Sequence, residues 1–372
     1  MEIDPKSFNF PKIARLPNFS GKIKLEEIMQ ISVNEKASDI HLQSKLPPIL
    51  RINKRLFSIA TDILLPADLL ALLEDLATPQ QLETFKAALD YDFAYNFKDI
   101  VRFRVNLFSE KNSFGAALRK IPIEIPTLEK LGLPEAVIKF ANLNSGFVLI
   151  TGSTGQGKTT TLAALANRIN RERDALIISI EDPIEYVFTN KKSVVLQREV
   201  GPNTKSFAVA LRAILREDPD VILIGEMRDL ETTATALTAA ETGHLVFATL
   251  HTNSAVQTID RIIDFFPPYQ QQQVRGQLAT VISGIVSQQL LEKIDNQGVV
   301  LATEVLIPTL AMRNLVRDNN TKVIQSLLQT TTENCMISMD RSIKALYDDR
   351  KITREIALKH ALNREEFIKT IS

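Results

Sequence analysis

The sequence predicts an α/β protein, in which a mostly parallel β-sheet domain follows a smaller α+β domain and ends in a helical C-terminal part. Short apolar runs between residues 146 and 250 alternate with helical segments, which is typical of a parallel sheet covered by helices on both faces. Between residues 91 and 121 apolar and polar residues alternate, as in an antiparallel meander with one buried face. After Pro268 the apolar spacing is mostly helical.

The composition is that of an ordinary globular protein. The 372 residues suggest two domains or slightly more, and 45% of them are hydrophobic. The formal net charge is zero, which disfavours a nucleic-acid partner because phosphate contacts usually require a basic excess. A lone cysteine, Cys335, excludes a disulfide framework and fits a reducing cytoplasm. Since no signal peptide or membrane-span pattern is found, we expect a cytoplasmic protein that meets a membrane only indirectly, through partners.

The first third of the chain predicts a small domain with a loose extension before it. Residues 1–22 are expected to form a flexible N-terminal extension, because prolines interrupt any regular element there. Residues 23–121 are expected to form the α+β domain, and residues 122–134 a proline-containing linker. Within that domain we expect a helix over 25–33, strands at 39–43 and 49–52, a helical stretch over 66–89, and three meander strands over 91–121.

Residues 135–372 are expected to form the second domain. Its predicted strands lie at 146–151, 176–180, 194–197, 221–224 and 245–250. The helical segments expected after Pro268 cover 270–291, 311–316, 323–328, 339–346 and 354–362.

The residues from Gly152 to Thr159 have the spacing G-x-x-x-x-G-K-[ST] between a predicted strand and a predicted helix, which is the pattern of a P-loop. Glycines let backbone N–H groups face one anion at a helix N-terminus. Lys158 would reach the β- and γ-phosphates, and the Thr159 hydroxyl would bind Mg²⁺. An ordinary glycine-rich turn is the alternative, and the complete pattern disfavours it. We therefore expect ATP and Mg²⁺ as cofactors, bound by Ser153, Thr154, Gly155, Gln156, Gly157, Lys158, Thr159 and Thr160.

Two acidic stretches follow predicted strands, where parallel sheets place their ligands. Glu185, after the strand at 176–180, could polarise the attacking water, although a solvated acidic loop is equally compatible with the sequence. Glu226 follows an apolar strand in a Walker-B-like position and would hold Mg²⁺, through water, or order the nucleophile. The commonest Walker B form has an Asp directly after the strand, so this sequence departs from it.

Two histidines flank the predicted strand at 245–250. His244 and His251 are seven residues apart and point to opposite faces, so a shared zinc site is not expected. His251, at the carboxyl end of the strand, is the better candidate for sensing the γ-phosphate. His244 is placed with the nucleotide-binding residues, and capping of the preceding helix is an equal alternative.

Four stretches in this order resemble the Walker A, Asp-box, Walker B and His-box motifs of the secretion ATPases that power type IV pili and type II secretion. They cover residues 152–159, 180–186, 220–229 and 243–252. The resemblance extends from about Leu25 to the C-terminus, and residues 215–229 and 311–317 are similar to the type IV pilus retraction ATPases within that superfamily. The segment 311–317 also has the spacing of a plain amphipathic helix, and the two interpretations are compatible.

The resemblance implies a RecA-like ATPase domain preceded by a PAS-like domain, assembled as a homo-hexamer. It implies a cytoplasmic location peripheral to the inner membrane, on a platform protein of the pilus machine, where ATP turnover drives pilin removal. By position, the family's catalytic glutamate falls on Glu185 and its Walker B glutamate on Glu226. The departures are Gln156 and Thr159, where relatives often carry Ser, and the extension before Leu25.

Arginines of the meander are expected to complete the site. Arg102 and Arg104 are two residues apart and share one strand face, and Arg119 lies on the next run. Alternation alone predicts only a solvated sheet face. In the family that the chain resembles, arginines of this domain reach the nucleotide, and in a ring the contact can come from the neighbouring subunit, so Arg104 and Arg119 are expected among the catalytic residues.

Three alternatives remain open at this point. Pilus-assembly and type II secretion ATPases share the four motifs, but many carry a four-cysteine zinc motif that a single cysteine cannot form. An accessory ring subunit that hydrolyses ATP poorly is disfavoured by the intact carboxylates. A RecA-like DNA motor is disfavoured by the neutral charge and the absence of an aromatic and basic stripe.

Overall fold

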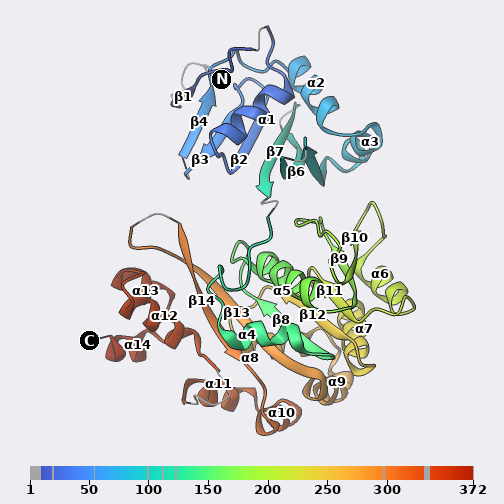
Figure 1. Cartoon of the computed structure of the whole chain (residues 1–372), viewed down its shortest axis with the longest axis vertical. Coiled ribbons are helices and arrows are strands. Elements are labelled where there is room, and N and C mark those ends of the chain that lie inside the picture. Colours follow the sequence, from blue (N-terminus) through green and yellow to red (C-terminus); the bar gives the residue numbers. More distant parts are fainter. Residues whose placement is uncertain are drawn as a thin grey trace. The chain divides into compact units, whose positions relative to one another are not determined.

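The computed structural model divides the chain into two compact units (Figure 1). The first comprises Met1–Glu124 with Glu185–Val187, and the second Ile125–Ile184 with Phe188–Ser372. The structure describes residues 10–18, 21–53, 55–98, 100–110, 113–121, 124–295, 298–330 and 336–371. Pro5, Cys335 and the first two residues of the predicted linker lie outside them. The division falls within the segment predicted as a linker, but Leu128 and Leu133 in that segment are buried in a core of the second unit.

The first unit is built on a seven-stranded sheet in the order β1-β4-β3-β2-β7-β6-β5. Its strands are β1 Lys12–Ile13, β2 Asp39–Gln43, β3 Ile49–Ile52, β4 Arg55–Ile59, β5 Asp90–Phe97, β6 Val101–Glu110 and β7 Ser113–Ile121. Three helices, α1 Leu25–Asn34, α2 Pro66–Leu76 and α3 Pro79–Ala88, contribute apolar side chains to the core that the strands share. The predicted helical stretch over 66–89 is therefore two helices, each with a proline at its N-terminus.

The predicted meander is confirmed: β5, β6 and β7 pair in antiparallel order. On β6, Val101, Phe103 and Val105 are buried. Arg102 and Arg104 alternate with them and are only half-buried, so they occupy the opposite face. The period of two thus sorts apolar residues into the core and arginines onto an open face.

The N-terminal segment contains structure that the sequence did not predict. Lys12 and Ile13 form a short strand parallel to β4, and Arg15 makes an ion pair of 2.6 Å with the fully buried carboxylate of Glu27. The prediction that no regular element precedes Leu25 is wrong at these residues. Two residues are too few to show a period, and the strand forms by pairing with residues 58 and 59, far along the chain.

The second unit is built on another seven-stranded sheet, in the order β10-β9-β11-β12-β8-β13-β14. Its strands are β8 Gly146–Thr151, β9 Leu176–Glu181, β10 Val194–Glu199, β11 Val221–Ile224, β12 Leu245–Leu250, β13 Ile282–Glu292 and β14 Val299–Leu306. All pair in parallel except β13 with β14. Each strand predicted between residues 146 and 250 is present, and the predicted α/β class is confirmed.

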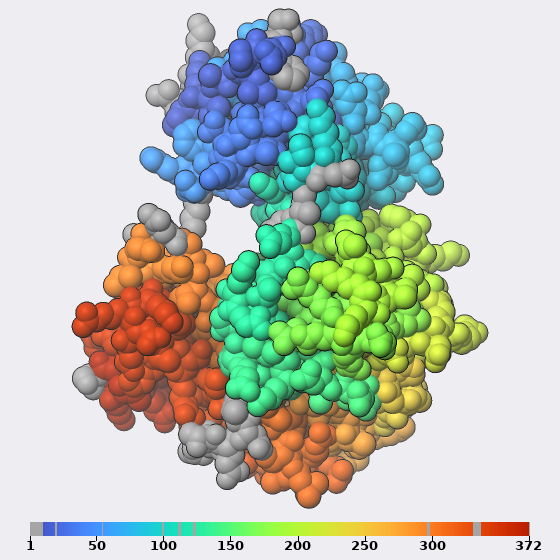
Figure 2. All heavy atoms as spheres, viewed as in Figure 1, coloured from blue at the N-terminus to red at the C-terminus, as the bar shows by residue number. Residues whose placement is uncertain are grey.

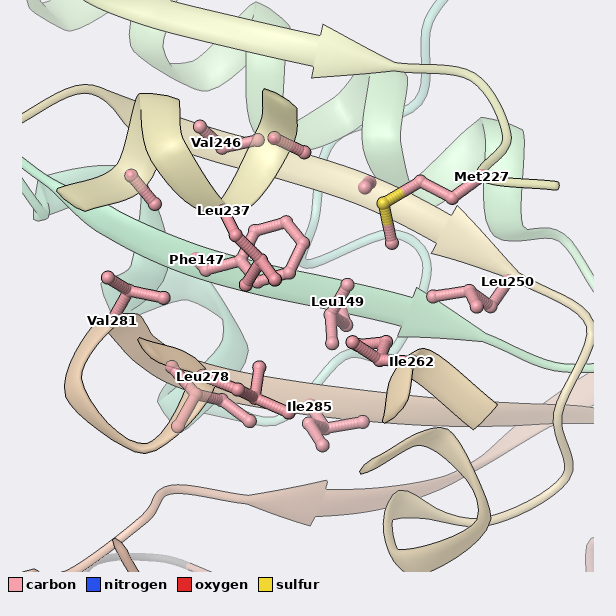
Figure 3. Packing of buried hydrophobic residues seen from close by; sticks show 14 of the residues in the cluster. Phe147, Leu149, Met227, Leu237, Val246, Leu250, Ile262, Leu278, Val281 and Ile285 are labelled. Carbon is pink, nitrogen blue, oxygen red and sulfur yellow. The ribbon is translucent and has the colours of Figure 1, made fainter. Parts of the chain in front are cut away.

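Helices cover both faces of this sheet, as the near-continuous apolar strands require. They are α4 Glu135–Ile138, α5 Lys158–Glu172, α6 Phe207–Ile214, α7 Leu230–Glu241, α8 Ala255–Asp264 and α9 Pro268–Val281, with a 3-10 turn at Lys139–Asn142. Figure 3 shows one of the two cores, where Phe147 and Leu149 on β8 pack among Leu237, Val246 and Ile262. The other face holds Val148 and Ile150 of the same strand.

The chain after Pro268 is less helical than predicted. The expected helix over 270–291 ends at Val281, and β13 begins at the next residue. Strand β14 was not predicted either. Ile282 follows Val281 directly, so no turn residue marks the change from helix to strand, and Ser287 and Gln288 interrupt the apolar alternation that identifies a strand.

The C-terminal part is helical, as predicted. Its helices are α10 Leu310–Arg317, α11 Thr321–Thr330, α12 Met339–Asp348, α13 Arg354–His360 and α14 Arg364–Thr370. The helices α12, α13 and α14 share a small core with parts of β13 and β14. These three helices form a lobe of the second unit (red in Figure 2). Among the described residues, no helix is long and apolar enough to cross a bilayer.

Candidate nucleotide-binding site

A tight loop joins β8 to α5, at the carboxyl edge of the parallel sheet. Gly152, at its start, has φ 147°, and a Cβ there would lie 2.6 Å from the carbonyl oxygen of Gln288. Because no L-side chain fits that space, the residue must be glycine. Gly157 caps α5 with φ 82°, and Lys158 is the first residue of the helix. The loop therefore leads directly into a helix N-terminus, which favours a bound phosphate.

Lys158 lies across this loop. Its ammonium donates to the carbonyl oxygens of Gly152 at 2.7 Å and Ser153 at 3.2 Å, and it lies 3.4 Å from Nδ1 of His251. Only 8% of the residue is exposed. The predicted phosphate-binding cation is thus held at the mouth of the loop by backbone oxygens.

His251 and Glu226 reach the same place from neighbouring strands. Parallel pairing puts Leu250 of β12 beside Thr151 of β8, and β11 lies on the other side of β12. His251 follows β12, and its Nδ1 lies 3.4 Å from the Thr154 hydroxyl while its Nε2 lies 3.0 Å from Glu226. The structure therefore gathers three predicted residues around the loop with Lys158.

Glu226 is a paired carboxylate. Burial acts to raise its pKa, but the Arg228 guanidinium at 2.7 Å and His251 hold the pKa of Glu226 below its ordinary value. It is therefore ionised at neutral pH. The Glu226 carboxylate and the Thr159 hydroxyl at the start of α5 supply hard oxygen donors, which is the donor chemistry that Mg²⁺ prefers.

Strand β13 forms a wall of the loop that the sequence did not predict. Ser287 accepts a hydrogen bond of 2.9 Å from Thr151, and the Gln288 amide donates to Thr161 of α5 at 2.8 Å. The Leu290 backbone N–H donates to the side chain of Gln156. The Gln156 side chain thus contacts the protein wall, so its predicted nucleotide contact would have to come from its backbone. Polar residues inside an otherwise apolar run, at 287–289, were the one available signal.

His244 is not near the loop. It precedes β12, at the amino ends of the parallel strands, whereas His251 lies at their carboxyl ends. The backbone carbonyl of His244 accepts a hydrogen bond from the N–H of Gly146, where β8 begins. Six strand residues separate the two edges, a distance of about 20 Å. Nδ1 of the His244 ring lies 2.9 Å from the carbonyl oxygen of Ala239 and 3.1 Å from the Thr242 hydroxyl. Through these contacts the ring caps the C-terminus of α7. The prediction that His244 contacts the nucleotide of its own P-loop is wrong, and the helix-capping alternative is correct.

Glu185 lies in the loop after β9 with a side chain that is 30% exposed. The residue before it is anchored, because the Ile184 N–H donates to Glu199 of β10 at 3.1 Å. By contrast, Glu181 of the same acidic stretch is buried and accepts from Ser179 at 2.7 Å, so it serves the fold. The catalytic role of Glu185 stays a prediction.

Arg104 and Arg119 are cross-strand partners on the open sheet face of the first unit. Arg104 donates to Asp92 at 3.3 Å, and Arg119 donates to the buried Asp39 at 2.9 Å. Burial acts to raise the pKa of Asp39, but Arg119 and a hydrogen bond from Ser38 hold it below its ordinary value. Both arginines are presented on one face, and their contact with a nucleotide stays a prediction.

A parallel sheet that carries a complete P-loop, with a paired carboxylate and a histidine at the ends of the adjacent strands, defines a P-loop nucleoside triphosphatase. The family to which this one belongs follows from comparison with known proteins. Residues 21–360 match the type II/IV secretion system protein family, and the chain is a member of it.

Individual relatives agree with this assignment. The type IV pilus retraction ATPase PilT of Pseudomonas aeruginosa is 43% identical over 92% of this chain and 99% of its own length. The type IV pilus ATPase PilU of the same organism is 39% identical over 91% of this chain and 89% of its own. The crystal structure of the pilus retraction motor PilT with bound ADP superposes with a TM-score of 0.86 and 46% identity, covering 94% of this chain and 100% of that one.

Proposed function

We propose that this protein is a motor subunit that hydrolyses ATP to power the retraction of type IV pili. The observation that carries the proposal is the group formed by Lys158, Thr154, His251 and Glu226 around a complete P-loop. The chain is similar over nearly its whole length to a retraction ATPase, and a solved relative of that name holds ADP.

The residues divide the chemical work as follows. The loop N–H groups and Lys158 bind the β- and γ-phosphates, while Thr159 and Glu226 would hold Mg²⁺, which would supply positive charge beside the transferred phosphoryl group. His251 contacts both Glu226 and Thr154, so it can couple the presence of the γ-phosphate to the loop after β11 that contains Glu226. Glu185 orients the attacking water as general base.

Assembly completes the proposal. The subunits form a homo-hexamer, in which Arg104 and Arg119 of one subunit supply positive charge to the γ-phosphate of the next. The ring works on the cytoplasmic side of the inner membrane against a platform protein of the pilus machine, and the first unit is a PAS-like domain. Two observations support this assembly: both arginines lie on one open face of the sheet, and the chain belongs to the type II/IV secretion system protein family.

Purified protein tests the proposed activity. We expect Lys158→Ala to abolish ATP turnover and to weaken ATP binding sharply, because the loop loses its charged donor to the phosphates. Lys191→Ala, which removes an exposed lysine of the same unit, is the matched control and should keep wild-type turnover. Wild-type turnover in the Lys158→Ala protein would refute the site.

Two further measurements separate the motor from the alternatives. DNA should leave the turnover unchanged, whereas stimulation by DNA would favour a nucleic-acid motor. Turnover by the chain alone should sustain pilus retraction in a strain whose own retraction ATPase is deleted. Negligible turnover with intact ATP binding would instead identify an accessory ring subunit.

A further inference from the structure

A buried carboxylate connects the nucleotide site to the C-terminal helices. Glu304 lies on β14 and is 4% exposed. One carboxylate oxygen accepts a hydrogen bond of 2.7 Å from the Ala255 N–H, and the other accepts one of 3.3 Å from the Met339 N–H. Ala255 is the first residue of α8 and Met339 the first residue of α12. One side chain therefore bridges the N-termini of two helices that are separated by 84 residues of chain.

The first of these helices begins where the histidine loop ends. Two residues of the loop 251–254 contact the P-loop. His251 lies beside the Thr154 hydroxyl, and the side chain of Asn253 accepts a hydrogen bond of 2.9 Å from the Ser153 hydroxyl. Ser254 caps α8 and accepts from Gln257 at 3.2 Å. The loop that contacts the P-loop is therefore directly followed by the N–H group that Glu304 accepts from.

The second helix belongs to the C-terminal lobe. Met339 is fully buried in the core that α12, α13 and α14 share. The residues beside Glu304 are tied to the start of the same segment: Val305 exchanges backbone hydrogen bonds of 2.8 and 3.1 Å with Ile337, and Thr303 donates to the Ser342 hydroxyl at 3.0 Å. Strand β14 and the segment that carries α12 are therefore joined by several hydrogen bonds, and Glu304 is the side chain that links them to the loop.

Burial of the Glu304 carboxylate costs free energy, and the space beside it allows its hydrogen bonds to change. Burial raises the pKa of the Glu304 carboxyl because it disfavours the charged form. The N–H groups of Ala255 and Met339, each at the N-terminus of a helix, offset part of this effect. Beside it lies a cavity of about 20 Å³, lined by residues of α8, α11 and α12 including Val256, Gln325 and Asp340. That volume is enough for one water molecule, which can replace a hydrogen bond when one of the two helices shifts.

We propose that Glu304 is a positioning residue that couples the nucleotide-sensing loop to the C-terminal helical lobe. Nucleotide contacts order the loop 251–254, the ordered loop holds the Ala255 N–H against Glu304, and the carboxylate in turn fixes the Met339 N–H and the first turn of α12. The proposal rests on the proposed nucleotide site. A carboxylate that only stabilises the fold would make the same two bonds in all states of the loop.

Hydrogen exchange on the full-length protein, with and without a non-hydrolysable ATP analogue and Mg²⁺, distinguishes these roles. In the wild type we expect the analogue to slow exchange in the P-loop and, by roughly fivefold, in the first turn of α12, which corresponds to strengthening one hydrogen bond. In Glu304→Gln, which keeps one acceptor, this response of α12 should shrink. In Glu304→Met, which keeps the length and loses both acceptors, it should vanish. Analogue affinity should stay within about twofold in both variants, because the open state of the helix is rarely populated.

Ser342→Ala is the matched control. It removes a hydrogen bond between β14 and α12 that does not involve the loop, so exchange should rise equally with and without the analogue while the response persists. An α12 response of wild-type size in Glu304→Met, or no response in the wild type, would overturn the coupling. Loss of the P-loop response in the wild type would instead overturn the proposed nucleotide site. A variant that unfolds is recognised by exchange across the sheet, and the other substitution then carries the test.

Discussion

The wall that β13 forms against the P-loop can be tested with two glycine substitutions. Gly152 and Gly155 both have positive φ, 147° and 80°, so alanine strains the backbone at either position. At Gly155 a Cβ meets nothing within 4 Å, whereas at Gly152 it meets the Gln288 carbonyl oxygen at 2.6 Å. The pair therefore separates backbone strain from the contact with β13.

The expected magnitudes differ by the cost of that contact. Gly155→Ala should destabilise the second unit by about 1 kcal/mol, from a left-handed conformation partly offset by a less flexible unfolded chain. Gly152→Ala adds displacement of a strand backbone, typically about 1–3 kcal/mol, to strain of similar size to that at Gly155, for a total of about 2–4 kcal/mol. For a unit of this size, these values correspond to decreases in the unfolding temperature of roughly 3 °C for Gly155→Ala and roughly 6–12 °C for Gly152→Ala.

Thermal unfolding without nucleotide, followed by circular dichroism, measures both variants against the wild type. Gly152→Ala should also lose ATP binding, because the loop can accept the Cβ only by moving away from β13. If the two variants were equally stable, the close packing of the loop on Gln288 would not exist, and β13 would have no part in shaping the site.

Three further predictions concern the remaining charged residues. Glu185→Gln keeps the shape of the side chain, so ATP affinity should persist while turnover falls by roughly 10²-fold, as for a lost general base; an equal loss of affinity in equilibrium binding would make Glu185 a binding residue. Arg104→Ala should impair hydrolysis with the ring intact, and mixing it with Glu185→Gln subunits should restore part of the turnover; verified mixed rings without any rescue would exclude an arginine that acts on a neighbouring subunit. Asp39→Asn should cost about 1 kcal/mol at pH 7, a value kept small by the exposure of Arg119 to solvent. Because the folded-state pKa of Asp39 is lowered, this contribution is fully present above the unfolded value near 3.9 and is lost as pH falls through the folded value, so the difference between the two proteins in urea unfolding should shrink progressively as the pH is lowered below about 3.9.

The parts of the site that sequence reasoning found are those with a local signature. Lys158 lies in a motif whose spacing is set by the loop itself, and Glu226 and His251 follow apolar strands whose carboxyl ends must meet in a parallel sheet. Strand direction alone therefore brought together residues nearly a hundred positions apart. The meander was equally accessible, because alternation on β6 decides which face Arg104 takes.

The parts that it missed depend on tertiary partners. Ile282–Glu292 continues directly from a helix, and the polar residues at 287–289 are explained by their bonds to Thr151, Thr161 and His360, which lie far away in the sequence. His244 was misplaced because motif proximity was weighed above strand direction, which puts the two ends of β12 at opposite edges. Glu304 has no signature in the sequence, since a single acidic residue in an apolar strand forms no pattern.

The pairing of β13 with β8 also has a consequence for the order in which the protein can mature. The three hydrogen bonds that join β13 to the end of β8, to the loop and to α5 connect residues 136, 127 and 134 positions apart. On the ribosome, β8 emerges long before the strand that covers it and stays an uncovered edge meanwhile, the kind of surface on which chains associate wrongly. The loop can therefore make its contacts with β13 only after Leu290 has emerged, so the nucleotide site is completed late in synthesis.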